Sequence, residues 1–219
     1  MCGRYTMSTR TEALEERFQA RIAAEGAAPT YNAAPSQEQL TILSDNPQAI
    51  VRAAWGFVPE WADGKAGVKS VINARADSVA TKPFFRAAFK KQRCLVLADG
   101  FYEWRRTKEG KRPYRITLKT DEPFAFAGLW STVHDRTGNK HATFTIITTE
   151  ANALIAQIHN RMPVILQEAD EEDWLNPQLP LEAAQAMLVP FPAELMTAYE
   201  VSSKVNSPAH NTPEVIERV

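Results

Sequence analysis

The stretch from residue 93 to residue 150 constrains the fold more than any other part of the sequence. It consists of runs rich in β-branched and aromatic residues, the composition typical of strands. The runs are RCLVLA (93–98), FYEWRR (101–106), YRITLK (114–119), FAFAGLW (124–130) and FTIITTE (144–150). Because short turns such as TKEGKR connect them, instead of helix-length crossovers, neighbouring strands must pair mostly antiparallel. The stretch therefore predicts a mainly antiparallel sheet that can curl into a barrel.

The remaining segments alternate shorter strands with helices that would flank the sheet, which makes the expected fold class α+β. Leu14, Phe18 and Ile22 recur at helical spacing and predict an amphipathic helix over roughly 10–24, followed by a loop with Pro29 and Pro35. Further helices are expected at 83–91, 151–159, 171–176 and 181–189, and further strands at 39–44, 50–55, 70–74, 162–167 and 198–202. We expect one domain over 1–219, with an irregular tail after about residue 204.

The composition is that of a globular chain. Of 219 residues, 44% are hydrophobic, which is enough for a substantial core. No run of about 18 apolar residues occurs, and the start MCGRYTMSTR lacks the apolar segment of a secretory signal. We therefore expect a cytoplasmic protein with no membrane partner. Cys2 and Cys94 are too few for a disulfide framework or a thiolate zinc site, so we expect neither a metal ion nor a cofactor.

Charge is distributed unevenly along the chain. The net charge is −1, but the segment from Lys65 to Lys119 has 15 Lys or Arg against four acids, a balance of +11, and the rest carries −12. Aromatic residues are interleaved with this basic block, as in grooves that hold single-stranded nucleic acid. Each basic side chain of 105–112, taken singly, is better explained as part of a solvated hairpin tip. The block as a whole favours single-stranded nucleic acid as a partner.

Cys2 has the most distinctive chemistry in the sequence. If Met1 is removed, an α-amino group with a pKa of about 7.7–8.0 and a thiol with a pKa near 8.5 lie side by side, and both are partly nucleophilic near neutral pH. An aldehyde would form a Schiff base with the amine, on which the sulfur can close to a five-membered thiazolidine. Taken alone, however, a cysteine at the second position is better explained as an accident of the start codon.

Three further polar residues lie in apolar contexts, namely Asn73, Glu103 and His159. Glu103 is either a buried ion-pair partner, with Arg75 or Arg161 as its cation, or an acid–base group with a raised pKa. His159 can be explained by capping the C-terminus of a helix, and Asn73 as a hydrogen-bonding residue in a strand bulge. These alternatives are open on the residues alone.

The same residues belong to a series of motifs in a fixed order. The motifs are CGRY (2–5), YNAAP (31–35), WGFVP (55–59), INAR (72–75), DGFYEW (99–104) and HNRMP (159–163). The series resembles that of the SRAP family, the abasic-site-processing proteins that are also called SOS response-associated peptidases. The resemblance extends from Cys2 to about Lys204. A chance match to six spaced motifs is implausible.

The resemblance implies a domain that senses abasic sites in single-stranded DNA and crosslinks Cys2 to the ring-opened aldehyde as a thiazolidine, protecting the lesion. It implies that Asn73 positions the sugar or the new N-terminus, and that Glu103 and His159 transfer protons. The DNA-binding residues that it implies are Arg4, Arg75, Trp61 and Arg161. Guanidinium groups suit phosphates, so Arg4 and Arg75 would hold the phosphates that flank the lesion.

Other expectations also follow from the resemblance. Family members have a Trp-rich loop after the WGFVP turn, whereas residues 59–63 contain only Trp61, which weakens a role in parting DNA strands. Met1 must be removed because an acylated amine forms no imine, either by the chain itself, as the name peptidase suggests, or by an aminopeptidase. Cys94, among apolar neighbours, is expected to be an inert core thiol. We expect a monomer that associates with the nucleoid through DNA; a replication partner is compatible with this function but has no motif.

Two rival functions use the same residues differently. An N-terminal-nucleophile amidase or peptidase would use Cys2 to attack an amide, with its own amine as base, and has no use for the basic block. A non-catalytic single-stranded DNA-binding module would not need Cys2 at all. A papain-like peptidase is disfavoured, because Cys2 lacks the preceding chain that such nucleophiles have.

Overall fold

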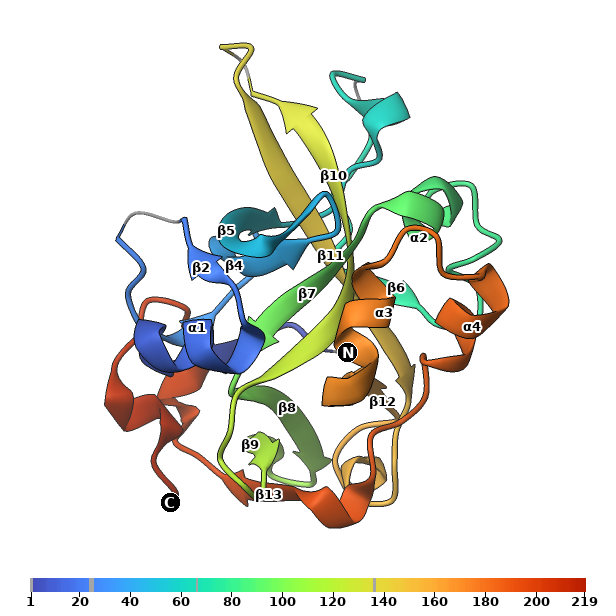
Figure 1. The fold of residues 1–219 in the computed structure, drawn as a ribbon. Coiled ribbons are helices and arrows are strands. Elements are labelled where there is room, and N and C mark those ends of the chain that lie inside the picture. The colour runs from blue at the N-terminus through green and yellow to red at the C-terminus, as the bar shows by residue number, and fades with distance from the viewer. Residues whose placement is uncertain (1, 24–25, 66, 136) are drawn as a thin grey trace.

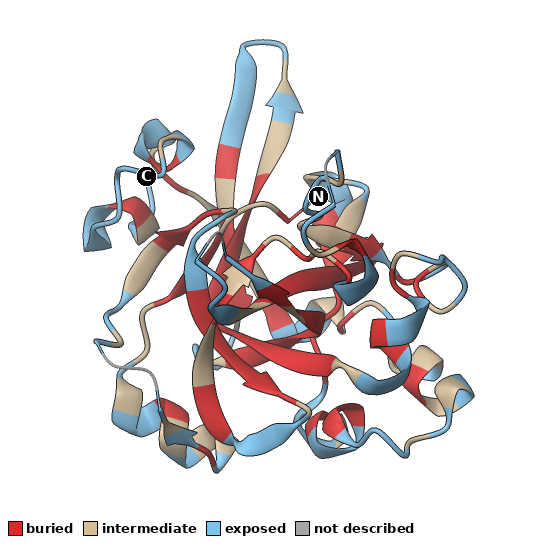
Figure 2. Ribbon diagram, turned by 90° about the horizontal axis from the view of Figure 1, so that it is seen from above, coloured by how far each residue is buried: buried red, intermediate tan, exposed pale blue. Residues whose placement is uncertain are grey.

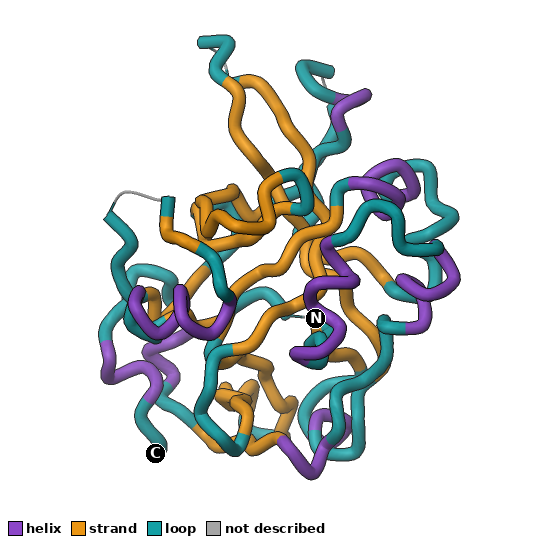
Figure 3. Tube along the Cα trace, in the orientation of Figure 1, coloured by secondary structure: helices purple, strands orange, loops and turns teal. Residues whose placement is uncertain are grey.

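Strands form the centre of the molecule and short helices lie around them (Figure 1, Figure 3). The computed structural model describes residues 2–23, 26–65, 67–135 and 137–219. The strands are β1 (Tyr5–Met7), β2 (Arg21–Ile22), β3 (Thr30–Ala33), β4 (Glu38–Leu43), β5 (Asn46–Trp55), β6 (Asn73–Arg75), β7 (Arg93–Ala98), β8 (Gly100–Thr107), β9 (Gly110–Leu118), β10 (Phe124–His134), β11 (Lys140–Glu150), β12 (Arg161–Pro163) and β13 (Met196–Glu200). The α-helices are α1 (Thr11–Phe18), α2 (Arg86–Lys91), α3 (Glu171–Leu175) and α4 (Leu181–Ala186). The 3-10 helices are η1 (Glu60–Ala62), η2 (Ile155–Gln157), η3 (Glu168–Asp170), η4 (Ala193–Leu195), η5 (Ser203–Asn206) and η6 (Pro213–Ile216).

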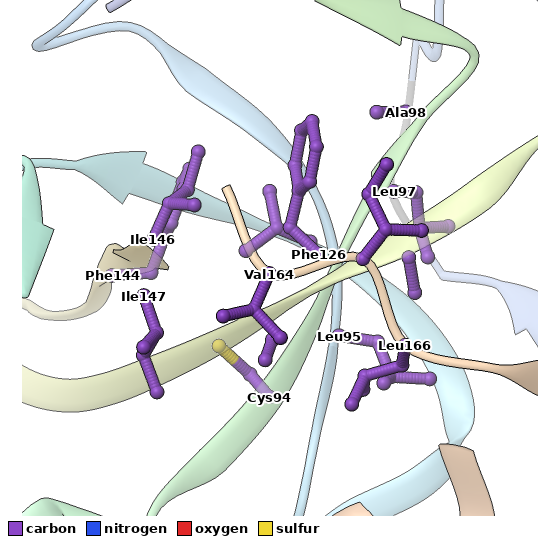
Figure 4. Packing of buried hydrophobic residues seen from close by; sticks show 14 of the residues in the cluster. Cys94, Leu95, Leu97, Ala98, Phe126, Phe144, Ile146, Ile147, Val164 and Leu166 are labelled. Atoms are coloured by element: carbon purple, nitrogen blue, oxygen red, sulfur yellow. The ribbon is translucent and has the colours of Figure 1, made fainter. Parts of the chain in front are cut away.

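Five strands of the larger sheet close on themselves as a barrel. β11 pairs with β10, β10 with β7, β7 with β4 and β4 with β5, all antiparallel, and β5 returns to β11 in parallel. Buried side chains of these strands, among them Cys94 and Phe126, pack in one apolar cluster (Figure 4). At Gly128, β10 and β7 approach so closely that a Cβ atom would lie 2.7 Å from the sulfur of Cys94. This contact explains the glycine at that position.

The smaller sheet contains the N-terminal strand. Its strand order is β13-β9-β8-β1-β3, and all of its pairs are antiparallel. One face packs on the barrel, where the ring of Tyr5 lies 5.2 Å from that of Trp55 and 5.8 Å from that of Phe126. The opposite face is covered by the C-terminal segment, whose Val205 packs with Tyr102. Figure 2 shows the resulting contrast between the buried central strands and the exposed segments at the periphery.

The structure confirms the expected fold class, α+β with a mostly antiparallel, barrel-like sheet flanked by helices. Each of the five strand-like runs between residues 93 and 150 forms a strand. The tail beyond β13 forms two 3-10 helices, and Val201 bridges to Arg218. Among the described residues, the longest helix is far too short to cross a membrane.

The helix predicted over 10–24 is wrong in its second half. The α-helix ends at Phe18, because Gln19 takes a left-handed conformation with φ of 50°. The chain then enters β2, which pairs in parallel with β5, so Ile22 reaches the core from a strand. Residue 24 of the prediction lies outside the described part of the chain. Pairing with β5 overrode the helical periodicity of the sequence.

A second predicted helix, 151–159, is reduced to the single turn η2. Its start is fixed by Asn152, whose Oδ1 accepts hydrogen bonds from the backbone N–H groups of Leu154 and Ile155. The chain must then enter β12 at Arg161 to pair with β11, which leaves no room for further turns. His159 therefore lies in the connection to β12, and its interpretation as a helix cap is wrong.

Other boundaries also differ from the predictions. Strands β1 and β3 were not predicted, since runs of three or four residues carry little periodicity and β3 falls in the predicted loop. The predicted strand at 70–74 becomes β6, Asn73–Arg75, and the predicted helix at 83–91 begins only at Arg86. The predicted strand at 162–167 is β12 followed by an isolated bridge at Ile165. These shifts matter because β6 carries Asn73 and Arg75, and β1 directly follows Cys2 and Arg4.

Candidate functional site

Asp99 holds the N-terminal strand in place. The buried carboxylate follows β7, and its Oδ1 accepts a hydrogen bond from Thr6 Oγ1 at 2.6 Å. Its Oδ2 accepts hydrogen bonds from the backbone N–H and hydroxyl groups of Ser8 and Thr9. Arg115 completes the network with an ion pair at 3.3 Å. The sequence motif contains Asp99, but no role was predicted for it, since these partners come from β1 and β9.

Arg4 ties the same strand to the C-terminal segment. Its guanidinium donates hydrogen bonds to Asn32 Oδ1 at 2.8 Å and to the carbonyl oxygens of Val205 and Asn206 at 2.8 and 3.1 Å. A guanidinium has five N–H donors, so three are used within the protein. The predicted phosphate contact of Arg4 would therefore have two donors left. Arg4 is first of all an anchor for the N-terminal strand.

Cys2 is buried, and Glu103 is close enough to influence it electrostatically. The thiol donates a weak hydrogen bond to the carbonyl oxygen of Arg4 at 3.8 Å, and the residue is fully buried. Burial raises the pKa of this thiol well above its usual range, and the negative charge of Glu103 raises it further. The thiol is therefore protonated at neutral pH in this structure. A proton acceptor has to take up that proton when sulfur becomes a nucleophile, and Glu103 is within electrostatic reach.

The strand pairing explains how Glu103 reaches this position. The backbone N–H of Tyr102 donates to the carbonyl oxygen of Arg4 at 3.0 Å, which aligns β8 with the N-terminal segment. Glu103 is one residue further along β8 and is buried. Arg75 and Arg161, the cations considered as its partners, lie instead beside Asp77, at 2.5 and 3.9 Å. Of the two alternatives considered for Glu103, the ion pair with Arg75 or Arg161 is not formed between these described residues.

Strands β6 and β12 bring four other predicted residues together on either side of β11. Thr148 of β11 is the register partner of both Arg75 on β6 and Pro163 on β12. The Arg161 guanidinium donates to the carbonyl oxygen of Thr148 at 2.6 Å and to its hydroxyl at 3.2 Å. Burial lowers the pKa of Arg161, and the positive charge of Arg75 lowers it further, so the two cations are near neighbours. The site residues of this group are Asn73, Arg75, His159 and Arg161.

Asp77 neutralises part of this group, although no role was predicted for it. Hydrogen bonds from Arg75 lower the pKa of Asp77 to about 2, so the carboxylate is charged at neutral pH. The Arg75–Asp77 pair is largely exposed, with 56% and 51% of the side chains accessible. An exposed pair of this kind is weak and can exchange its anion. A phosphate could therefore compete with Asp77 for Arg75.

The Nδ1 atom of His159 makes two contacts with the backbone of Arg161. It lies 3.1 Å from the backbone nitrogen and 3.3 Å from the carbonyl oxygen. The first contact makes Nδ1 an acceptor and leaves the proton of a neutral imidazole on Nε2, whereas the second makes Nδ1 a donor. In the first of these tautomers, the half-buried ring offers an N–H donor at Nε2.

Asn73 presents an amide that is free to bind a ligand. Both polar atoms of its side chain are buried, and within the described residues they have no hydrogen-bond partner. Such groups are costly to bury and are enriched where a ligand supplies the missing contacts. The preceding carbonyl, of Ile72, accepts a hydrogen bond from the indole of Trp55 at 3.0 Å, and that ring packs on Tyr5. Contacts through Trp55 thus connect β6 with the strand that follows Cys2.

Two further predicted residues lie apart from these groups. Trp61 on η1 is 51% exposed, with its ring 6.2 Å from that of Phe84 and the ammonium group of Lys65 at 5.3 Å. Cys94 is a buried core residue, as expected, and burial raises the pKa of its thiol (Figure 4). Tyr5, which was not predicted as a site residue, lies near both thiols. Burial raises the pKa of its hydroxyl group, and the charges that Cys2 and Cys94 carry when ionised raise it further.

The chain is thus a barrel-based α+β protein in which a buried cysteine precedes the N-terminal strand, within electrostatic reach of a buried glutamate on β8. It belongs to the SRAP family, because the family profile described as SOS response associated peptidase (SRAP) matches residues 1–208. "Abasic site processing protein YoqW" of Bacillus subtilis (strain 168) is 45% identical to it over 99% of both chains. "Abasic site processing protein HMCES" of Xenopus tropicalis is 31% identical over 87% of this chain and 66% of that protein. A crystal structure of a protein from Bacteroides thetaiotaomicron superimposes with a TM-score of 0.89, at 30% identity and full coverage of both chains.

Proposed function

We propose that this protein senses abasic sites in single-stranded DNA and crosslinks to them through Cys2. The names of the relatives support abasic-site processing. The observation that carries the proposal for this chain is that the Cys2 thiol, which directly precedes an anchored N-terminal strand, lies buried within electrostatic reach of the Glu103 carboxylate on β8. The basic segment from Lys65 to Lys119 supplies the charge that a DNA strand requires.

The reaction proceeds in two balanced steps once Met1 has been removed. The α-amine of Cys2 adds to the aldehyde carbon of the ring-opened abasic sugar, and water leaves as the C=N bond forms. The thiol then adds across this bond, with sulfur bonded to carbon and the thiol proton delivered to nitrogen. Because the thiol is protonated in the resting structure, the amine is the first nucleophile and sulfur the second.

The remaining residues assist these proton transfers and hold the sugar. Glu103 takes the proton from the thiol and returns it to nitrogen, and His159 donates from Nε2 to the oxygen that leaves as water. The unpartnered amide of Asn73 binds the sugar or the new N-terminus. Arg75, Arg161 and Trp61 contact the strand on either side of the lesion.

The test is intact-mass analysis of the purified protein, alone and after incubation with an abasic oligonucleotide. We expect a mass that lacks Met1 and a second species with one oligonucleotide per chain, less one water. The adduct should persist under denaturing conditions, which separates crosslinking from DNA binding alone. Hydrolysis of small amides with no retained DNA would instead support the amidase. Loss of Met1 during incubation of purified full-length chain would assign that step to the protein itself.

Arg75 and Asp77 should affect DNA affinity in opposite directions. Arg75→Ala removes a phosphate contact, so we expect weaker binding and a log–log salt slope smaller by about 0.7. Asp77→Asn releases Arg75 from its carboxylate, so we expect binding about two to five times tighter, the strength of an exposed ion pair. Arg21→Ala is the matched control, since Arg21 is likewise exposed and paired with Glu15 but lies outside the basic block. A salt titration with an unchanged slope for Arg75→Ala would exclude Arg75 from the phosphate contacts.

A further inference from the structure

The face of β8 that carries Glu103 continues toward the tip of the β8–β9 hairpin. Residues directly opposite each other in a sheet share a face, and residues two apart on a strand do too. The register pairs Phe101 with Ile116, Glu103 with Tyr114 and Arg105 with Arg112, without interruption. Arg105 therefore lies on the same face as Glu103, about 7 Å further along the strand.

Arg105 is held by an aromatic ring and has no anion of its own. Its guanidinium lies over the ring of Tyr114, 4.9 Å from the centroid. Among the described residues, no carboxylate comes within ion-pair distance of Arg105. Arg112, directly opposite, has two carboxylate partners, Glu109 at 2.6 Å and Glu200 at 3.6 Å.

This arrangement is unfavourable for the protein by itself. Two like charges directly opposite on a sheet repel, and only one of this pair is neutralised within the chain. A phosphate oxygen beside Arg105 would relieve the repulsion. The contact with the Tyr114 ring also restrains the Arg105 side chain, so less side-chain entropy is lost when it binds.

We propose that Arg105 binds a backbone phosphate of the DNA strand, one or two nucleotides from the abasic site. The inference rests on the proposed function, because it takes Glu103 as the position of the lesion. It assigns to the hairpin a phosphate subsite, distinct from Arg75 and Arg161 on β6 and β12. The DNA strand would then run from the barrel toward the tip of the β8–β9 hairpin, where Arg105 and Arg112 lie.

Arg106 provides a matched control for this subsite. It is the next residue on β8, exposed, and its side chain lies on the opposite face, across from Lys111. Arg105→Gln and Arg106→Gln remove the same charge from the same hairpin. Any effect of net charge on DNA binding is therefore common to both variants.

The experiment measures noncovalent binding of both variants to an oligonucleotide with a tetrahydrofuran analogue of the abasic site, which has no aldehyde. For Arg105→Gln we expect affinity about tenfold lower, the value of a charge-assisted hydrogen bond, and a salt slope smaller by about 0.7. For Arg106→Gln we expect affinity within twofold of wild type. Equal losses in the two variants would overturn the subsite, since only general attraction would then remain. Melting temperatures, expected to be unchanged, show that both variants are folded.

A scan of the DNA backbone gives a second and independent result. Single phosphates around the analogue are replaced by uncharged methylphosphonates. At one position, the difference between wild type and Arg105→Gln should vanish, because the partner of Arg105 has been removed. A difference that persists at every position would contradict a defined phosphate contact. Failure of the proposed function is distinguished from these outcomes, because wild type itself would then fail to crosslink to the aldehyde, whether or not it binds the analogue.

Discussion

Cys2→Ser should abolish the durable adduct with abasic DNA while the chain still binds DNA. The amine remains and can form an imine, but oxygen closes a less persistent ring than sulfur does, so the product hydrolyses. Borohydride reduction should trap this imine as a stable secondary amine. The measurement is denaturing electrophoresis with and without reductant. A heat-stable adduct of Cys2→Ser without reductant would exclude the thiazolidine.

Two companion variants make this result specific. Cys94→Ala removes the other thiol, which is buried in the barrel, and should retain the adduct per folded molecule. Cys2→Ala tests the non-catalytic alternative: a pure binding module would be unaffected in every assay, whereas we expect crosslinking to be lost with the affinity for DNA unchanged. The three variants together separate binding, imine formation and ring closure.

Glu103→Gln should slow crosslink formation by about 10² to 10⁴, the usual contribution of a positioned acid–base group, and His159→Ala by a similar factor. Gln has nearly the same shape as Glu but cannot accept the thiol proton. The rate is measured in single turnover, and the melting temperature on the same preparation. If Glu103 were only a buried structural charge, its removal would cost about 3–5 kcal/mol of stability. A large fall in melting temperature with an unchanged rate per folded molecule would show a structural role.

The Glu103→Gln variant also changes the ionisation of Cys2 in a predictable direction. The negative charge of Glu103 raises the pKa of the thiol, so removing it should lower that pKa. Burial is the larger cause, and we therefore expect the pKa to stay above its usual range. Thiolate absorbance against pH, compared in wild type and variant, gives the shift. An unchanged titration would mean that Glu103 has no electrostatic contact with Cys2.

The sequence predicted the barrel strands because their residues carry the structural information locally. The runs at 94–98 and 124–130 are apolar almost over a full strand, and the turns between such runs exclude crossovers. The segment at 151–159 has an equally clear helical pattern, but Asn152 and the pairing of β12 with β11 override it. Short strands such as β1 exist only through their partners, so local patterns could not reveal them.

The candidate site was predictable to a similar extent. Motifs identified Cys2, Asn73 and Glu103 as candidates, and the structure brings Cys2 and Glu103 together. The pairing of Arg75 with Asp77 was not predictable, because an i to i+2 contact depends on the turn that follows β6. The availability of Arg105 for an anion was equally unpredictable, because it depends on Glu200, from β13, pairing with Arg112.

The Asp99 network has a consequence for the kinetics of a nucleophile at a chain end. The first residues of a domain are usually poorly ordered, and an amine on a frayed end would sample many orientations before each productive encounter. Here the hydrogen bonds from Thr6, Ser8 and Thr9 to Asp99 fix the strand a few residues from Cys2. The conformational entropy of the chain end is therefore lost during folding and not when DNA binds. Well-oriented groups of this kind reach effective concentrations of about 10⁵ to 10⁸ M in intramolecular reactions. A terminal amine, ordinarily one of the most mobile groups of a protein, would thereby react as part of a rigid framework.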